Sequence, residues 1–150
     1  MQIILHSIDE TTPQSIQEGG GIGYWCEFEA ALGSGKALFI PRGKALESDP
    51  STPLDVRVQV ESISEFQPLS PGEPQVFQLT PLQAPGDYRA KGRTVSLVWL
   101  DDEQQDAVLE VLVGEDIFSI SAESLGEAPV EFGEWVSFTI HRLILIETRA

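Results

Sequence analysis

The sequence predicts an all-β fold: a single-domain antiparallel barrel or two-sheet sandwich of about eight to ten strands, with little helix. Two observations support this prediction. Apolar and polar residues alternate with period two in many short segments, and no window of about a dozen residues keeps the 3.6-residue apolar stripe of an amphipathic helix. A length of 150 residues and a hydrophobic content of 41% are enough for one core.

The first half of the chain is expected to hold strands at residues 2–8, 24–30, 36–40 and 55–66. Cys26 and Phe28 share one face of the second strand while Glu27 and Glu29 share the other, which is typical of a strand buried on one side. The fourth strand repeats this alternation from Val56 onwards.

Residues 67–87 hold five of the ten prolines, together with two glycines. Because proline has no backbone donor, this segment is expected to be loop or sheet edge, with one strand at 75–79. It separates two halves, 1–66 and 88–150, that each end in a long strand. An ancient duplication would explain this similarity, but alternation alone also produces it.

The second half predicts a meander followed by one long strand. A polar loop and a tight turn at Gly114 separate the three meander strands. The last strand is the most apolar of the chain, and towards its end both faces are apolar. Such a strand lies centrally or bends from one sheet into the other at a bulge. The expected strands are residues 94–100, 107–113, 117–121 and 135–146.

From Thr94 to His141 the chain has no lysine or arginine and carries eleven carboxylates, within a net charge of -15. Most of these side chains must face water and produce a strong negative potential. The leading hypothesis is therefore a non-catalytic protein-binding module, similar in class to inhibitors and immunity-type proteins, with an acidic face for a basic partner. The expected partner-binding residues are the acids at two meander turns and one apolar anchor: Asp101, Asp102, Glu103, Asp106, Glu115, Asp116 and Trp25.

Two alternatives remain open. The first is a nucleic-acid-binding barrel of the oligonucleotide-binding type, in which central cations neutralise phosphates. The negative field of the chain opposes this, and neighbouring acids offer the cations other partners. Its expected binding residues are Lys36, Arg42, Lys44, Arg89, Lys91 and Arg93. The second alternative is a barrel that binds a small ligand or a metal ion.

No motif in the sequence assigns a cofactor or a metal. Residues 33–36 lack the first glycine and the final hydroxyl of a phosphate loop, so a hairpin turn is expected there. The glycine run at 19–23 is followed by no helix, which predicts a flexible loop. The acidic segment 101–106 lacks the glycine and glutamate spacing of an EF-hand.

No catalytic residue is assigned either. Cys26, the single cysteine, shares a face with Phe28 and is expected to be a buried, inert thiol. His6 and His141 would come close only if the first and last strands pair, and lone histidines on strands are more often structural, with a backbone partner. No serine lies in a G-x-S-x-G elbow.

The expected location is the cytoplasm. The N-terminal segment has no basic leader, and its apolar run is too short for a signal peptide. A single cysteine gives no support to an oxidising compartment. The longest aliphatic stretch, at 143–146, is far shorter than the roughly 20 residues of a membrane span.

Overall fold

The computed structural model describes residues 1–16, 21–42, 52–99, 107–121 and 132–148. All regular structure in these ranges is strand, which confirms the all-β prediction. The strands are β1 (Gln2–Ile8), β2 (Gln14–Ile16), β3 (Gly21–Ala30), β4 (Gly33–Ile40), β5 (Leu54–Pro68), β6 (Gln78–Pro81), β7 (Tyr88–Trp99), β8 (Ala107–Val113), β9 (Asp116–Ser121) and β10 (Trp135–Glu147). No helix in this part of the chain is long and apolar enough to cross a membrane.

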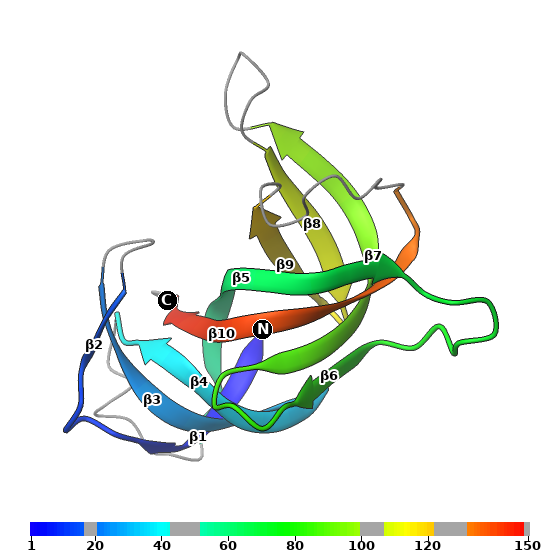
Figure 1. Ribbon diagram of the computed structural model, residues 1–150. Coiled ribbons are helices and arrows are strands. Elements are labelled where there is room, and N and C mark those ends of the chain that lie inside the picture. Colours follow the sequence, from blue (N-terminus) through cyan, green and yellow to red (C-terminus); the bar gives the residue numbers. More distant parts are fainter. Residues whose placement is uncertain (17–20, 43–51, 100–106, 122–131, 149–150) are drawn as a thin grey trace.

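The hydrogen-bonded strands close into two rings that share β5 and β10. In the first ring β1, β3, β4, β10 and β5 pair in succession, and β1 pairs back onto β5. In the second ring β5, β9, β8 and β7 pair in succession, and β7 pairs with β10. Figure 1 shows β5 and β10 side by side across the middle of the molecule, with β8 and β9 on one side and β1, β3 and β4 on the other, while β7 crosses from one side to the other. Ring closure of this kind leaves few exposed strand edges.

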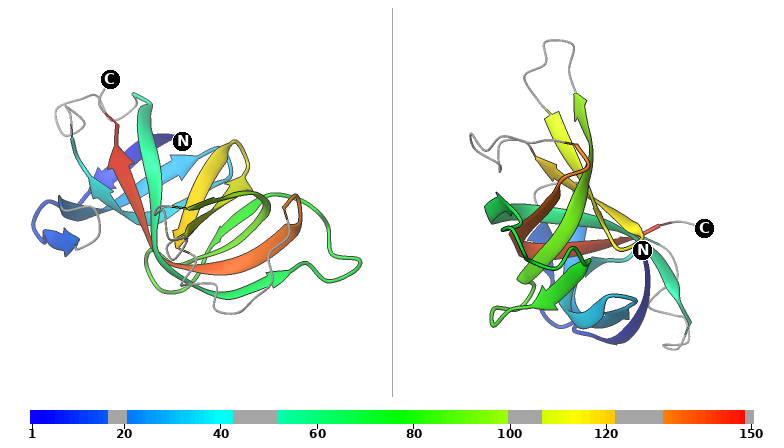
Figure 2. Two further views of the ribbon diagram at one scale, coloured as in Figure 1. Left: turned by 90° about the horizontal axis from the view of Figure 1, so that it is seen from above. Right: turned by 90° about the vertical axis from the view of Figure 1, so that its right-hand side faces the viewer.

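The last strand, β10, is central and bends, as its sequence predicts. Its first part pairs with β7 and its last part pairs with β4, while β5 accompanies it along nearly its whole length. The left view of Figure 2 shows the change of direction. Arg142 has a positive φ of 58° at this point. Ile140 before it and Leu143 after it both enter the main core, so the inward-facing positions change from even to odd numbers there.

One main core runs through both rings, and a smaller apolar cluster lies on the opposite face of β10. The main core includes Phe28 and Phe39 from the first ring and Leu109 and Phe118 from the second. The smaller cluster consists of Ile16, Leu38, Ile40, Ile144 and Ile146, with Trp25 packed against it. Both faces of the end of β10 are therefore covered, which explains why that segment is apolar throughout.

Two parts of the sequence prediction need correction. Gly21 and Gly23 were expected in a loop, but they belong to β3. A Cβ atom at Gly23 would lie 2.6 Å from Ile16 Cδ1, so glycine allows β2 to pack closely on β3. The first half of β7 was missed because its inward positions include Ala90 and Gly92, whose small size weakens the apolar alternation.

β3 and β4 do form a hairpin, but its turn lies at residues 31–32 and not at 33–36, where the sequence predicts it. Ala30 pairs with Gly33, so the turn consists of the two residues between them and the glycine-rich segment 33–36 lies within β4. Tyr88, at the start of β7, reaches this strand and donates a hydrogen bond of 2.7 Å from its hydroxyl to the Lys36 carbonyl. The predicted edge in the proline-rich segment is confirmed, since β6 pairs only with β7 among the described strands.

Candidate functional site

The meander β7–β8–β9 has one buried face and one partly exposed face. On β8, Leu109 and Val111 are fully buried, whereas Val108 and Leu112 point the other way and are half-buried. The strand pairing sets Val98 opposite Val108 and Leu112 opposite Ile117. The aliphatic side chains that share this outer side are called the meander face below: Val98, Val108, Leu112 and Ile117. Val98 is 41% exposed and Ile117 is 40% exposed.

One carboxylate lies within the meander face. Glu110 pairs with Ser96 on one side and Ser119 on the other. The Ser96 hydroxyl donates a hydrogen bond of 2.8 Å to Glu110 Oε1. This carboxylate is therefore oriented and partly desolvated among aliphatic neighbours, and it has no lysine or arginine nearby in the sequence.

The structure describes three of the seven residues predicted to bind a partner. Glu115 is exposed, in the turn between β8 and β9, and Asp116 forms an ion pair of 2.8 Å with the terminal ammonium of Met1. Trp25 lies on β3, half-buried against the smaller apolar cluster, and β3 is not a neighbour of β8 or β9. The remaining four lie outside the described residues: Asp101, Asp102, Glu103 and Asp106.

The six cations of the nucleic-acid alternative do not form one surface. Arg89, Lys91 and Arg93 alternate along β7 on its outer side and are called the β7 cations below. Lys36 lines a hollow beside Glu27 and Glu29 on the first ring, and Arg42 lines another hollow beside Glu147. Lys44 lies outside the described residues.

Each of the β7 cations already has a protein partner. Arg89 forms an ion pair of 3.4 Å with Glu65, and Lys91 forms one of 3.5 Å with Glu73. Arg93 donates a hydrogen bond of 3.2 Å from Nε to the Gly133 carbonyl. Trp135 is directly opposite Arg93 on β10, and its ring centroid lies 4.9 Å from that of Phe77.

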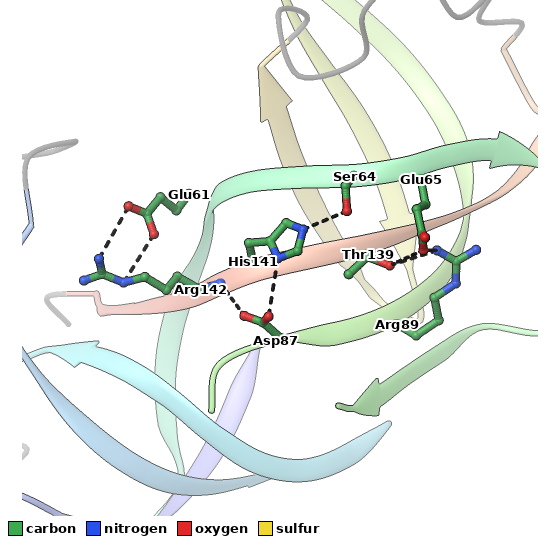
Figure 3. A network of polar contacts seen from close by, with 8 residues as sticks. All are labelled: Glu61, Ser64, Glu65, Asp87, Arg89, Thr139, His141 and Arg142. Carbon is green, nitrogen blue, oxygen red and sulfur yellow. Dashed lines mark hydrogen bonds and ion pairs between the residues drawn. The ribbon is translucent and has the colours of Figure 1, made fainter. Parts of the chain in front are cut away.

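A polar network crosses the outer side of β5, β10 and the start of β7 (Figure 3). Its centre is His141 on β10. Ser64 Oγ lies 2.7 Å from His141 Nε2, and Asp87 Oδ2 lies 3.3 Å from His141 Nδ1. The backbone amide of Arg142 donates a hydrogen bond of 3.3 Å to Asp87 Oδ1. The guanidinium of Arg142 forms an ion pair of 3.2 Å with Glu61.

The second part of the network is centred on Thr139. The Thr139 hydroxyl donates to Glu65 Oε2 at 3.1 Å and accepts a hydrogen bond of 3.0 Å from Arg89 Nη1. Arg89 Nη2 donates to Ser137 Oγ at 2.9 Å. In the strand pairing Thr139 is opposite both Ser64 and Arg89, so these three side chains form one row across β5, β10 and β7.

The contacts of the two histidines differ from the expected ones. Both ring nitrogens of His141 have side-chain partners rather than a backbone partner. His6 pairs with Glu29 at 2.9 Å, and β1 and β10 are not paired in the described sheet, so the two histidines belong to separate sites. Ser64 and Asp87 lie 77 and 54 residues from His141, and no local motif in the sequence announces them.

Cys26 is buried, as predicted, with 3% of its surface exposed. Burial raises the pKa of its thiol from 9.0 to about 12. The thiolate is therefore strongly disfavoured in the folded protein, which suits a packing residue and not a nucleophile.

The raised pKa of Cys26 predicts a loss of stability at alkaline pH. Above pH 9 the unfolded chain loses the thiol proton while the folded protein keeps it, so the free energy of unfolding falls as pH rises towards 12. The expected slope reaches about 1.4 kcal/mol per pH unit. Urea unfolding at a series of pH values should show this slope in the wild type and lose that contribution in Cys26→Ala. Identical pH dependence in the two proteins would contradict it.

Metal binding is not supported among the described residues, which contain no group of three or more histidine, cysteine, aspartate and glutamate side chains placed to hold an ion. The acidic segment 101–106 lies outside them. Comparisons of this chain with protein-family models, with curated proteins and with solved structures find no match.

Proposed function

We propose that the protein is a binding module that presents its meander face to a basic protein partner. The observation that carries the proposal is the combination of partly exposed Val98 and Ile117 with Glu110 on one outer side of β7–β8–β9. Protein interfaces commonly have an apolar centre with a polar rim. We place the interaction in the cytoplasm, which suits a protein with a single, buried cysteine.

Charge complementarity identifies the kind of partner. The sequence from Thr94 to His141, which includes β8, β9 and the whole meander face, has eleven carboxylates and no lysine or arginine. A surface of one sign attracts partners of the other sign over about 10 Å at 0.1 M salt and suppresses association with anionic ones. A basic protein with an apolar contact region therefore fits this face best.

The test compares two variants that each place a lysine at an exposed isoleucine. Ile117→Lys changes the meander face, and Ile22→Lys is the matched control on β3, where Ile22 is 56% exposed. Immobilised wild type and Ile22→Lys should retain the same basic protein from native lysate. Ile117→Lys should bind it at least about tenfold more weakly, a loss of about 1.4 kcal/mol. Salt of about 1 M, which shortens the Debye length to about 3 Å, should release it.

Two results would contradict the proposal. One is equal retention of the same protein by Ile117→Lys and wild type. The other is a wild-type column that retains no basic protein after nuclease treatment. Circular dichroism of each variant confirms that the strands are intact before the columns are compared.

Nucleic-acid binding is the second candidate, and one observation favours it. The β7 cations lie on one outer side of β7, with Trp135 opposite Arg93 as an aromatic surface. Nucleic-acid binding stays the second candidate for two reasons. Arg89 and Lys91 already form ion pairs with Glu65 and Glu73, and the net charge of -15 repels a polyanion. The same column experiment separates the two functions. If the protein binds nucleic acid, nuclease treatment would remove the bound material, and the Ile117→Lys column would retain as much nucleic acid as the wild-type column.

A further inference from the structure

Ser64, His141 and Asp87 have the connectivity that nucleophilic catalysis requires. Ser64 Oγ lies 2.7 Å from His141 Nε2, and the other ring nitrogen, Nδ1, lies 3.3 Å from Asp87 Oδ2. A base within hydrogen-bonding distance of a hydroxyl, itself oriented by a carboxylate, is the arrangement that activates a serine. Figure 3 shows the His141 imidazole between the side chains of Ser64 and Asp87, and the three residues come from three separate segments of the chain.

Backbone contacts hold the carboxylate in place. Asp87 Oδ1 accepts the Arg142 amide at 3.3 Å, which leaves Oδ2 for the imidazole. Gly86 accepts a hydrogen bond of 2.8 Å from the Leu143 amide through its carbonyl, so the turn before β7 is tied to β10 on both sides of Arg142. The orientation of Asp87 relative to His141 is therefore set by the backbone of β10 itself.

The backbone is strained next to two of the three residues. Among the described residues, the non-glycine positions with positive φ are Glu65, at 55°, and Arg142, at 58°. Glu65 directly follows Ser64, and Arg142 directly follows His141. Such conformations cost about 1–3 kcal/mol each and cluster at functional sites. At both positions the strain lies where β5 and β10 present the Ser64 and His141 side chains.

The site is open to solvent and has a positive charge in its row. His141 is 41% exposed at its side chain and Asp87 is 22% exposed. Thr139 is opposite both Ser64 and Arg89, and it accepts a hydrogen bond from Arg89. The Arg89 guanidinium therefore lies in the row that holds the serine, with Thr139 between the two residues.

We propose that Ser64 is a nucleophile that accepts acyl groups from small carboxylic esters, with His141 as the base and Asp87 as the positioning residue. Ser64 Oγ forms a bond to the ester carbonyl carbon, and its proton passes to His141 Nε2. The carbon–oxygen bond to the leaving group breaks, and His141 returns the proton to the departing alcohol. Water, deprotonated by His141, then attacks the acyl-serine, which releases the carboxylic acid and restores the Ser64 hydroxyl.

The test uses p-nitrophenyl acetate as the probe and mass spectrometry to locate the acetyl group on the intact protein. The wild type should carry acetyl on Ser64 and release p-nitrophenol in step with it. Ser64→Ala should abolish this label, and His141→Gln should slow acetylation of Ser64 by about a hundredfold. Ser62→Ala is the matched control, because Ser62 is opposite His141 in the strand pairing yet its hydroxyl is not the partner of the imidazole. It should acetylate at the wild-type rate.

Asp87 requires a separate measurement, since it acts through His141. Asp87→Asn should lower the maximal acetylation rate while the ester concentration that gives half of that rate stays unchanged. A change in the half-saturating concentration alone would assign Asp87 to ester binding and contradict its positioning role. Release of p-nitrophenol at the same rate by the wild type and Ser64→Ala, or equal acetylation of Ser64 in the wild type and His141→Gln, would overturn the proposal. Both results leave the partner-binding test of the meander face unaffected.

Discussion

Phe138→Ala is expected to lower the free energy of unfolding by about 3–5 kcal/mol. Phe138 is fully buried in β10, one of the two strands shared by both rings, and lies at the register shift between β10 and β5. It pairs with Ala90 of β7, and its ring centroid is 6.1 Å from that of Phe66 on β5. Alanine would leave a cavity between these strands that small neighbours cannot fill. Such a loss is a large part of the about 5–15 kcal/mol that stabilises a typical domain.

The measurement is urea unfolding followed by circular dichroism. Phe132→Ala is the matched control, because Phe132 is 62% exposed just before β10. Removing it should change the free energy of unfolding by less than about 0.5 kcal/mol, as at most exposed positions. If Phe138→Ala and Phe132→Ala lowered the free energy of unfolding by similar amounts, the β5–β10 pair would not be the centre of the core.

The sequence predicts the individual strands well where one face of a strand is consistently apolar. The span of β8 agrees with the predicted residues 107–113, which are all apolar except Glu110 and which alternate in the structure between buried and half-buried positions. Strand pairing is less predictable. The contact between Ser64 and Thr139 joins residues 75 positions apart, and period-two alternation is satisfied equally by many other partners of β5.

The two surfaces differ in how far the sequence could reveal them. The absence of lysine and arginine from residues 94–141 is visible from composition alone, and the meander within that segment follows from alternation and turn residues. The face of the sheet to which Ser64, Asp87 and His141 belong depends on long-range pairing and on the positive φ of Arg142. No local pattern encodes that backbone conformation for an arginine, since glycine and asparagine are the residues that favour it.

The same bend explains why one strand can serve two environments. Up to His141, alternate residues of β10 face the polar network, where Thr139 accepts a hydrogen bond from Arg89 and His141 Nε2 is hydrogen-bonded to Ser64 Oγ. Beyond Arg142 both faces are covered by apolar clusters. A straight strand would have placed Leu143 on the side of His141, so the bend keeps the main core continuous while the polar row stays exposed.

Gly92→Ala is expected to lower the free energy of unfolding by about 1–3 kcal/mol through overpacking. A Cβ atom at Gly92 would collide with the Leu112 carbonyl oxygen of β8 and lie 2.9 Å from side-chain carbons of both Val111 and Val113. The colliding atom belongs to the backbone of a paired strand, so β7 and β8 must separate, and Gly92 also pairs with Val136 of β10. The strain therefore spreads to the second ring as a whole.

Gly21→Ala provides the control, because it makes the same chemical change in β3 without a collision with backbone. Its Cβ atom would lie 3.3 Å from Ile40 Cγ2. We expect this variant to be neutral or to gain about 0.4–1 kcal/mol, since alanine restricts the unfolded chain. Differential scanning calorimetry of the two variants measures the contrast. Equal melting temperatures would mean that β7 and β8 adjust freely at Gly92, which the fully buried Val111 and Val113 on either side of the contact argue against.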